Sequence, residues 1–194
     1  MTSGVTFHPL SGEQALAHMD ELRYLYQDVY ADPPYEWGTE HADLFVERFQ
    51  VQARQDGFAL VEARHGTELV GVIFGVTLQP TTPWWQNLLG PLPEAVTTER
   101  PGRTFAVVEL LVRKAWRRQH IAQHMHDLLL SDRPEERATL TVLPAATPAQ
   151  RAYAKWGWRR VAQKRNPLPG SPVFDVLVKE LRSDRTEQVL AGLS

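Results

Sequence analysis

The residues best suited to chemistry lie in a short basic segment that follows a long apolar run. Residues 104–112 read TFAVVELLV, and the basic residues directly after them are Arg113, Lys114, Arg117 and Arg118. A helix is predicted to begin at about His120. The first N–H groups of a helix have no partner within it, and the helix dipole adds positive potential at that end. The segment therefore predicts a binding site for an anion such as a pyrophosphate.

Glu109 is an ionisable residue in the middle of the apolar run. Glutamate is seldom fully buried without a partner, so one at this position needs an explanation. Two interpretations stay open. Glu109 is either a general base, acting directly or through water, or a buried carboxylate paired with an arginine or a backbone donor.

Histidines near the start of the predicted helix raise the question of a metal site. His120 and His124 share a helical face, but the glutamate of the H-E-x-x-H pattern is missing and no third ligand is evident. We therefore predict no metal, and we expect His120, His124 and His126 on a solvated helix face. The sequence has no cysteine, which excludes disulfides, zinc thiolates and a thiol nucleophile.

The elements that must position these residues follow from hydrophobic periodicity and turn signals. In chain order we predict a strand at Val5–Phe7, helices from Ser11 to Tyr26 or Tyr30 and at His41–Gln55, strands at Phe58–Arg64, Glu68–Leu78 and Thr104–Val112, a helix at about His120–Leu130, a strand at Thr139–Leu143, a helix at Pro148–Lys155, a short strand around Val161 and a last strand at Val173–Leu181. This order favours one α/β domain with a mixed sheet over residues 1–182, followed by a C-terminal tail over residues 183–194.

A long irregular segment, Gln79–Arg103, interrupts this pattern and is rich in proline. Loops of this length in compact domains are usually functional or mobile. Aromatic residues gather in this segment and around the first two helices: Tyr24, Tyr26, Tyr30, Tyr35, Trp37, Trp84 and Trp85. They line a substrate pocket, or they are core or dimer-contact residues, and the sequence does not separate these interpretations. A homodimer is left open.

Composition and charge exclude several classes of function. The net charge is −2 and the pI is about 6.4, so there is no global electrostatic case for nucleic acid. The basic pairs Arg159-Arg160 and Lys164-Arg165 are short and favour a solvated face. No stretch approaches the roughly 20 apolar residues of a membrane helix, and the first residues do not resemble a secretory signal. We expect a soluble cytoplasmic protein that binds neither nucleic acid nor membrane.

Two motifs in this order resemble the GNAT superfamily of N-acetyltransferases. The cofactor motif of that family is Arg/Gln-x-x-Gly-x-Gly/Ala after a strand that ends in valine, and this chain has Arg117-Arg118-Gln119-His120-Ile121-Ala122 shortly after Val112. Family members often continue with Ala-x-x-x-Tyr-x-x-x-Gly-Phe, and residues 149–158 read AQRAYAKWGW, with Trp158 in place of phenylalanine. The order of elements fits the family over nearly the whole chain.

Two residues depart from the family pattern. Glycine usually stands at the position of His120, because the backbone approaches the phosphates closely there. The family also often has asparagine at the position of Ala146, which would supply a polar contact near the cofactor.

The resemblance implies a GNAT-like α/β fold, with a mixed, mostly antiparallel sheet of six to seven strands and about four helices. It also implies a splayed pair of parallel strands that receives the pantetheine arm of acetyl-CoA. By this resemblance, the cofactor-binding residues are Leu110, Leu111, Val112, Arg117, Arg118, Gln119, His120, Ile121, Ala122 and Gln123. The N–H group near Leu110 would then face the thioester oxygen.

The implied activity is direct transfer of the acetyl group of acetyl-CoA to a primary amine, without a metal. Tyr153 matches the family tyrosine near the sulfur and is the candidate acid, although packing against Trp156 or Trp158 would also explain it. Glu109 is the candidate base. A small-molecule amine is the expected acceptor. The alternatives are a peptide or protein N-terminus, and a non-catalytic acyl-CoA-binding or sensing protein.

Overall fold

A computed structural model describes residues 4–33, 35–166 and 170–181, and the predicted tail over residues 183–194 lies outside this part of the chain. Residue contacts divide the chain into two compact units. The first unit contains residues 1–76 and 107–133, and the second contains residues 77–106 and 134–194. Strand β4, Thr104–Val112, begins in the second unit and continues into the first.

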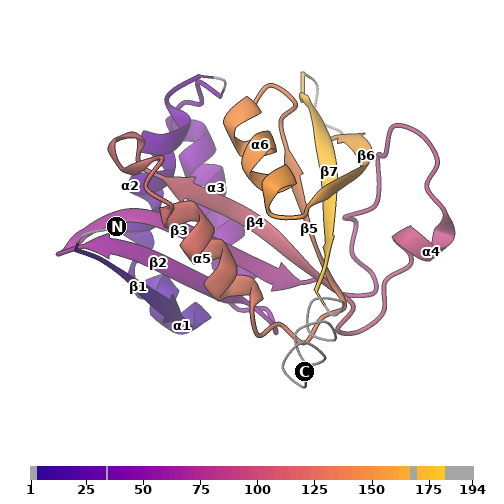
Figure 1. Cartoon of the computed structure of the whole chain (residues 1–194), viewed down its shortest axis with the longest axis horizontal. Coiled ribbons are helices and arrows are strands. Elements are labelled where there is room, and N and C mark those ends of the chain that lie inside the picture. Colours follow the sequence, from indigo (N-terminus) through magenta and orange to yellow (C-terminus); the bar gives the residue numbers. More distant parts are fainter. Residues whose placement is uncertain (1–3, 34, 167–169, 182–194) are drawn as a thin grey trace, which may run out of the picture. The chain divides into compact units, whose positions relative to one another are not determined.

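The sheet has seven strands in the order β1-β2-β3-β4-β5-β7-β6 (Figure 1). The pairs β1–β2, β2–β3, β5–β7 and β6–β7 are antiparallel. Strands β4 and β5 are parallel, and Thr104–Ala106 pair with Arg137–Thr139. A mixed, mostly antiparallel sheet with one parallel pair confirms the predicted fold class. The splay of that pair stays a prediction.

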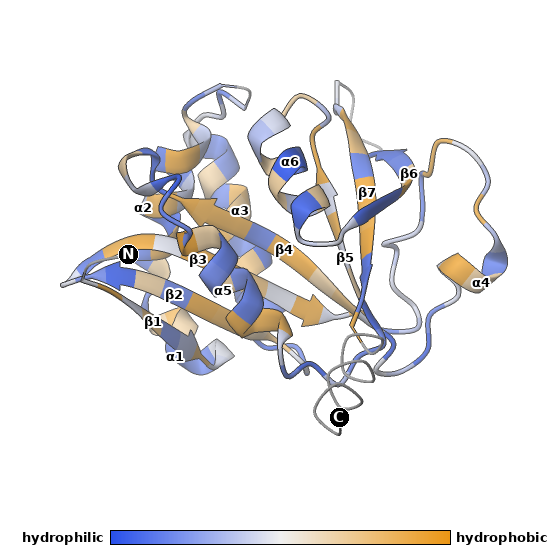
Figure 2. Cartoon of the chain, viewed as in Figure 1, coloured by the Kyte–Doolittle hydropathy of each residue, from blue (hydrophilic) through white to orange (hydrophobic). Residues whose placement is uncertain are grey.

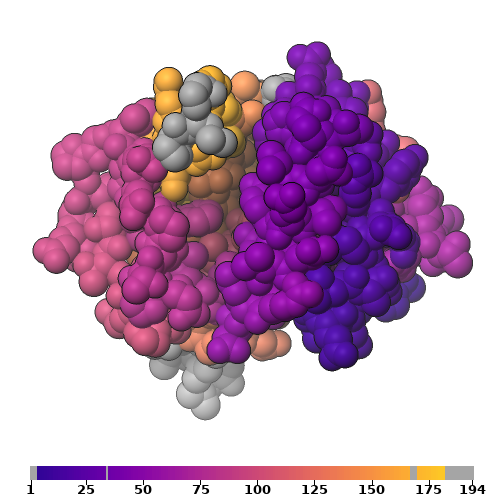
Figure 3. All heavy atoms as spheres, turned by 180° about the vertical axis from the view of Figure 1, so that it is seen from behind, coloured from indigo at the N-terminus to yellow at the C-terminus, as the bar shows by residue number. Residues whose placement is uncertain are grey.

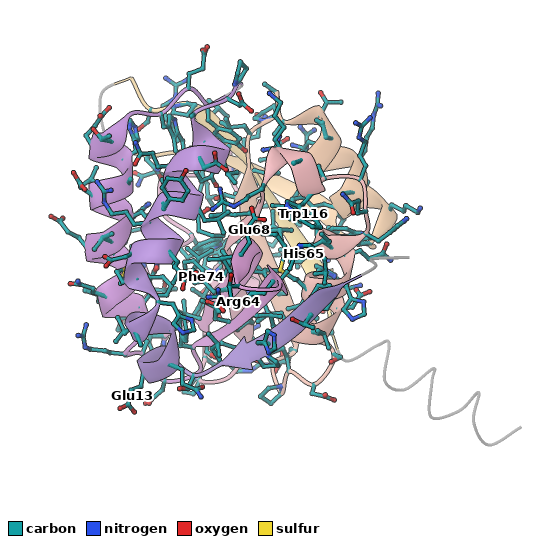
Figure 4. The ribbon with its side chains drawn as sticks, turned by 90° about the vertical axis from the view of Figure 1, so that its left-hand side faces the viewer. Glu13, Arg64, His65, Glu68, Phe74 and Trp116 are labelled. Carbon is teal, nitrogen blue, oxygen red and sulfur yellow. The ribbon has the colours of Figure 1, made fainter. Side chains whose placement is uncertain are left out.

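The first unit is built from three strands, the end of β4 and a helical layer. Its elements are β1 (Val5–Leu10), α1 (Gly12–Ala17), α2 (Met19–Tyr30), α3 (Thr39–Gln52), β2 (Ala59–His65), β3 (Glu68–Thr77), the 3₁₀-helix η1 (Lys114–Trp116) and α5 (Ile121–Leu130). Helices α2 and α3 cover one face of these strands, and α5 covers the other (Figures 1 and 4). Strand β3 is accordingly buried along nearly its whole length. Its apolar residues and those of β4 mark the interior of the unit (Figure 2).

The core of the first unit is aromatic and aliphatic. Phe45 and Phe49 of α3 pack with Phe74 of β3, with ring centroids 4.9 Å apart for Phe49 and Phe74. The outer surface of α2 and α3 is visible from behind (Figure 3). It carries the exposed side chains of Leu44 and Val51. Burial of one face of each helix therefore fixes these elements against the sheet.

The expected first helix is two helices, α1 and α2, separated at His18. Ser11 and Gln14 form the predicted capping box at the start of α1. The imidazole of His18 lies 2.8 Å from the buried carboxylate of Glu62 on β2. This long-range contact fixes the position of His18 between the two helices. Helix α2 ends at Tyr30, shortly before Pro33.

The second unit contains the remaining elements. These are α4 (Glu94–Thr97), the start of β4, β5 (Arg137–Val142), α6 (Thr147–Lys155), β6 (Arg159–Arg165) and β7 (Val173–Glu180). Helix α4 is a single turn within the long segment predicted as a loop, Gln79–Arg103. Thr147-Pro148 begins α6 as the proline position predicts.

Candidate active site

The basic segment forms the predicted connection between β4 and α5. Helix α5 begins at Ile121, and its N-cap residue His120 makes no side-chain hydrogen bond to the helix. The first hydrogen bond of this turn joins the His124 N–H to the His120 carbonyl, at 3.0 Å. The N–H groups of Ile121, Ala122 and Gln123 precede it and have no partner inside the helix. The helix start can therefore receive an anion.

Two residues of the segment adopt a left-handed backbone conformation. Arg118 and His120 both have φ of 62°. L-residues other than glycine seldom adopt this conformation because Cβ crowds the carbonyl oxygen. The position of His120 therefore has the backbone geometry for which glycine is suited, although a histidine occupies it.

The hairpin of β2 and β3 anchors the start of the segment. Arg113 donates its N–H to the Val70 carbonyl at 2.9 Å and its Nε to the Leu69 carbonyl at 2.8 Å. The ring of Trp116 contacts that of His65, with centroids 4.8 Å apart (Figure 4). Gly71 leaves space for this arrangement, because a Cβ there would lie 2.9 Å from the Leu111 carbonyl oxygen.

The four basic side chains of the segment do not all gather at the helix start. Arg113 Nη1 lies 2.7 Å from Asp28 Oδ2, and Lys114 Nζ lies 3.1 Å from Asp32 Oδ2. Arg113 thus pairs with a carboxylate of α2, and Lys114 pairs with one that follows α2. Arg117 donates Nε to the Val112 carbonyl at 3.1 Å. Arg118 is exposed, so it and Arg117 are the cations that remain for an anion at the helix start.

Glu109 has a tyrosine as its neighbour rather than the arginine or backbone donor considered above. Tyr30 donates its hydroxyl to Glu109 Oε2 at 2.6 Å. Burial of the carboxyl group raises its pKa from the usual value to about 7. The hydrogen bond from Tyr30 and the positive charge of Arg48 lower that pKa and offset part of the effect of burial. A carboxyl group with a pKa near neutrality is suited to accept and release protons.

An aromatic cluster surrounds the tyrosine. The Tyr30 ring has its centroid 4.6 Å from each of the Tyr26, Tyr35 and Trp37 rings. Tyr35 and Trp37 are only partly buried. Because the rings touch one another, they leave no room between them for a ligand, so any substrate would contact the outside of the cluster. Tyr24, by contrast, is largely exposed, with Arg113 over its ring.

Tyr153 lies on α6 in the second unit and is buried. Its ring centroid is 5.7 Å from that of Trp156 and 5.9 Å from that of Trp158. These contacts agree with the packing alternative, and a role as an acid stays a prediction. Ala146 is the buried N-cap residue of α6 and provides no side-chain hydrogen bond.

The histidines of α5 differ from the expectation of a solvated face. His126 is buried, and its Nδ1 lies 2.9 Å from Asp127 Oδ1, so that part of the expectation is wrong. His124 is exposed and stacks on Phe7 with a centroid distance of 4.3 Å. Among the residues that the structure describes, no group of three or more histidine, cysteine or acidic side chains could hold a metal ion. No helix in the same residues combines the length and apolar character needed to cross a membrane.

A comparison with models of protein families identifies the family of this chain. The model of the acetyltransferase (GNAT) family matches residues 22–158. The chain therefore belongs to this family and is an acyltransferase. No match was found among curated proteins.

Solved structures share the fold at low sequence identity. The ribosomal-protein-S18-alanine N-acetyltransferase of Escherichia coli has a TM-score of 0.61 at 11% identity, over 91% of this chain and 94% of that one. The PaiA N-acetyltransferase of Thermoplasma acidophilum, in complex with coenzyme A, has 0.58 at 11%, over 91% and 98%. NAA60 of Arabidopsis thaliana, in complex with acetyl-CoA, has 0.61 at 15%, over 91% and 98%. Identities this low establish the fold alone.

Proposed function

We propose that this protein transfers the acetyl group of acetyl-CoA directly to a primary amine of a small molecule. Glu109 carries the proposal. Its carboxyl group has a pKa of about 7, and it lies on β4, the strand that leads into the turn before α5. An alkylamine with a pKa near ~10.4 is mostly charged at neutral pH and must lose a proton before it attacks. Glu109 is the base for that proton.

The free N–H groups at the start of α5 support the proposed cofactor site. The pyrophosphate of acetyl-CoA binds these groups together with the side chains of Arg117 and Arg118. The backbone of Leu110–Val112 pairs with the pantetheine arm, and the Leu110 N–H donates to the thioester oxygen. These assignments follow the family motif together with the geometry of the turn.

The proposed reaction has a balanced set of steps. Glu109 accepts a proton from the ammonium group, and the neutral amine attacks the thioester carbonyl carbon. The new C–N bond forms, the C–S bond breaks, and Tyr153 donates a proton to the leaving thiolate. The second proton of the amine nitrogen passes through solvent to restore Tyr153, and Glu109 releases its proton to solvent. The products are an amide, free coenzyme A and one proton. No cysteine is present to carry an acyl-enzyme intermediate.

Release of the coenzyme A thiol tests the proposal. The protein is incubated with acetyl-CoA and a panel of small amines, amino acid derivatives and N-terminal peptides, and free thiol is measured. Glu109→Gln should lower kcat/KM by about 100-fold or more, because general base catalysis typically contributes that much. Glu13→Gln, which changes an exposed carboxylate of α1, is the matched control and should behave as wild type (Figure 4).

Separate measurements distinguish the alternatives. Tyr153→Phe should lower kcat and leave coenzyme A binding unchanged in calorimetry, and an unchanged kcat would remove Tyr153 from the mechanism. Turnover with peptides alone would indicate a peptide or protein N-terminal acetyltransferase. Saturable acetyl-CoA binding without turnover on any acceptor would indicate a sensing protein and refute the proposed activity.

A further inference from the structure

The two oxygens of the Glu109 carboxyl group have different surroundings. Oε2 accepts the hydroxyl of Tyr30 at 2.6 Å, a short distance typical of a hydrogen bond to a charged oxygen. Oε1 accepts no hydrogen bond from any residue that the structure describes. Oε1 is also absent from the set of fully buried polar atoms that lack a partner, so it is not fully enclosed by the protein. One oxygen is therefore fixed, and the other is available.

Tyr30 is held in place from several directions. It is the last residue of α2, and its carbonyl accepts the Trp37 N–H at 2.9 Å. The chain returns to it through a tight turn in which Glu36 has φ of 51° and donates its N–H to the Asp32 carbonyl. The rings of Tyr26, Tyr35 and Trp37 all contact its ring. A tyrosine fixed in this way presents its hydroxyl in one direction.

The Tyr30 hydroxyl is a hydrogen-bond donor rather than a proton carrier. Burial and the neighbouring Glu109 hold its pKa well above the usual value, so it keeps its proton at neutral pH. Three other titratable groups of the first unit lie around Glu109. They are Tyr26 on α2, Tyr35 in the turn after α2, and Arg48 on α3. Burial and the charge of Glu109 raise the pKa of Tyr35, and the positive charge of Arg117 opposes this rise. Only Tyr30 donates directly to the Glu109 carboxylate among these described residues.

We infer that Tyr30 is a positioning residue for acetyl transfer: its hydroxyl fixes Oε2 of Glu109, so that Oε1 accepts the proton of the acceptor amine. The inference rests on the proposed role of Glu109 as the base. A hydrogen bond to the ionised form also favours ionisation, so Tyr30 keeps the base active at a lower pH than burial alone would allow.

Tyr30→Phe tests the inference, since it keeps the ring and removes only the hydroxyl. The rising limb of kcat/KM against pH should lie near 7 in the wild type and move upward by about one pH unit in the variant, the size expected for loss of a hydrogen bond to a charged group. Titration of the amine substrate contributes equally to every variant, so the difference reports the enzyme. Tyr35→Phe is the matched control, because its ring touches Tyr30 but its hydroxyl does not donate to Glu109. Its rising limb should not move.

A second readout does not depend on activity. In protein labelled with ¹³C at the glutamate carboxyl carbon, Glu109→Gln identifies the Glu109 signal, which is then titrated in the wild type and in both tyrosine variants. A midpoint that rises in Tyr30→Phe alone supports the inference, even if no acceptor has yet given turnover. An unchanged midpoint, or an equal rise in Tyr35→Phe, overturns it, while continued acetyl transfer would leave the proposed function intact.

Discussion

At the scale of single residues, the turn before α5 has an unusual backbone. Arg118 and His120 are both left-handed, and neither is a glycine. Each such residue costs about 1 kcal/mol or more compared with glycine in the same conformation. The closest side-chain partner of His120 is Gln123, at 3.5 Å, which is too long to compensate this cost. The turn therefore retains strain that the family's usual glycine avoids.

His120→Gly should stabilise the protein by about 0.5–1 kcal/mol, because relief of the left-handed strain exceeds the entropy that glycine adds to the unfolded chain. The free energy of unfolding is measured by urea denaturation. Ala122→Gly is the matched control, since Ala122 lies in the first turn of α5 and should lose stability. A loss of stability in both variants would mean that His120 makes a compensating contact.

At the scale of elements, the long segment Gln79–Arg103 is held firmly in the second unit. Glu99 Oε1 accepts hydrogen bonds from Trp85 Nε1 at 2.8 Å, Thr104 Oγ1 at 2.8 Å and Arg137 Nη2 at 2.9 Å. Both Glu99 and Arg137 are buried. Burial lowers the pKa of Arg137, and Glu99 opposes that effect. The segment is thus anchored by a buried ion pair.

Arg137→Met should destabilise the protein by about 3 kcal/mol, because it leaves the Glu99 carboxylate buried without its cation. Adding Glu99→Gln should recover at least about half of that loss, since the amide can still accept from Trp85 and Thr104 without carrying a charge. Urea denaturation of both single variants and the double variant measures the coupling. A double variant no more stable than Arg137→Met would show that lost packing, not an unpaired charge, causes the effect.

The same segment also covers an edge of the sheet. Leu89 donates its N–H to the Gln163 carbonyl at 2.8 Å, and Arg165 donates to the Asn87 carbonyl at 3.2 Å. Leu88 forms an antiparallel bridge with Lys164 on β6. Free strand edges pair readily with other chains. The covered stretch of β6 is therefore not available for pairing between copies of this protein.

At the scale of the whole molecule, β4 connects the two units. Its first residues pair with β5 in the second unit, and its last residues lead into the turn before α5 in the first. We propose that residues 1–182 fold as a single domain, since loss of either unit would remove partners from the same strand.

Unfolding in urea should therefore show one cooperative transition. In the double variant Trp37→Phe/Trp116→Phe, the remaining tryptophans all belong to the second unit, so fluorescence follows the unfolding of that unit. Far-ultraviolet circular dichroism of the same variant follows the secondary structure of both units. The two methods should give the same midpoint of unfolding. Saturating coenzyme A should raise both midpoints together, by mass action. Two separate midpoints would contradict a single domain.

Local sequence signals determined much of the framework of this protein. The apolar run of β4, the capping box at Ser11 and the proline at the start of α6 act within a few residues, so the elements that they predict are confirmed. The turn before α5 was predictable for the same reason. The break at His18 and the burial of His126 were not, because each depends on residues elsewhere in the chain.

Only the tertiary structure decided the surroundings of Glu109. The sequence marked this residue as unusual in an apolar strand, yet it left open both a base and a paired carboxylate. Tyr30 is 79 residues away along the chain, and no local pattern joins the two. The packing of α2 against the sheet brings the hydroxyl to the carboxylate, and the burial caused by the same packing moves the pKa of Glu109 to about 7. Desolvation depends on the atoms that surround a group in space, which is why the sequence alone could not determine it.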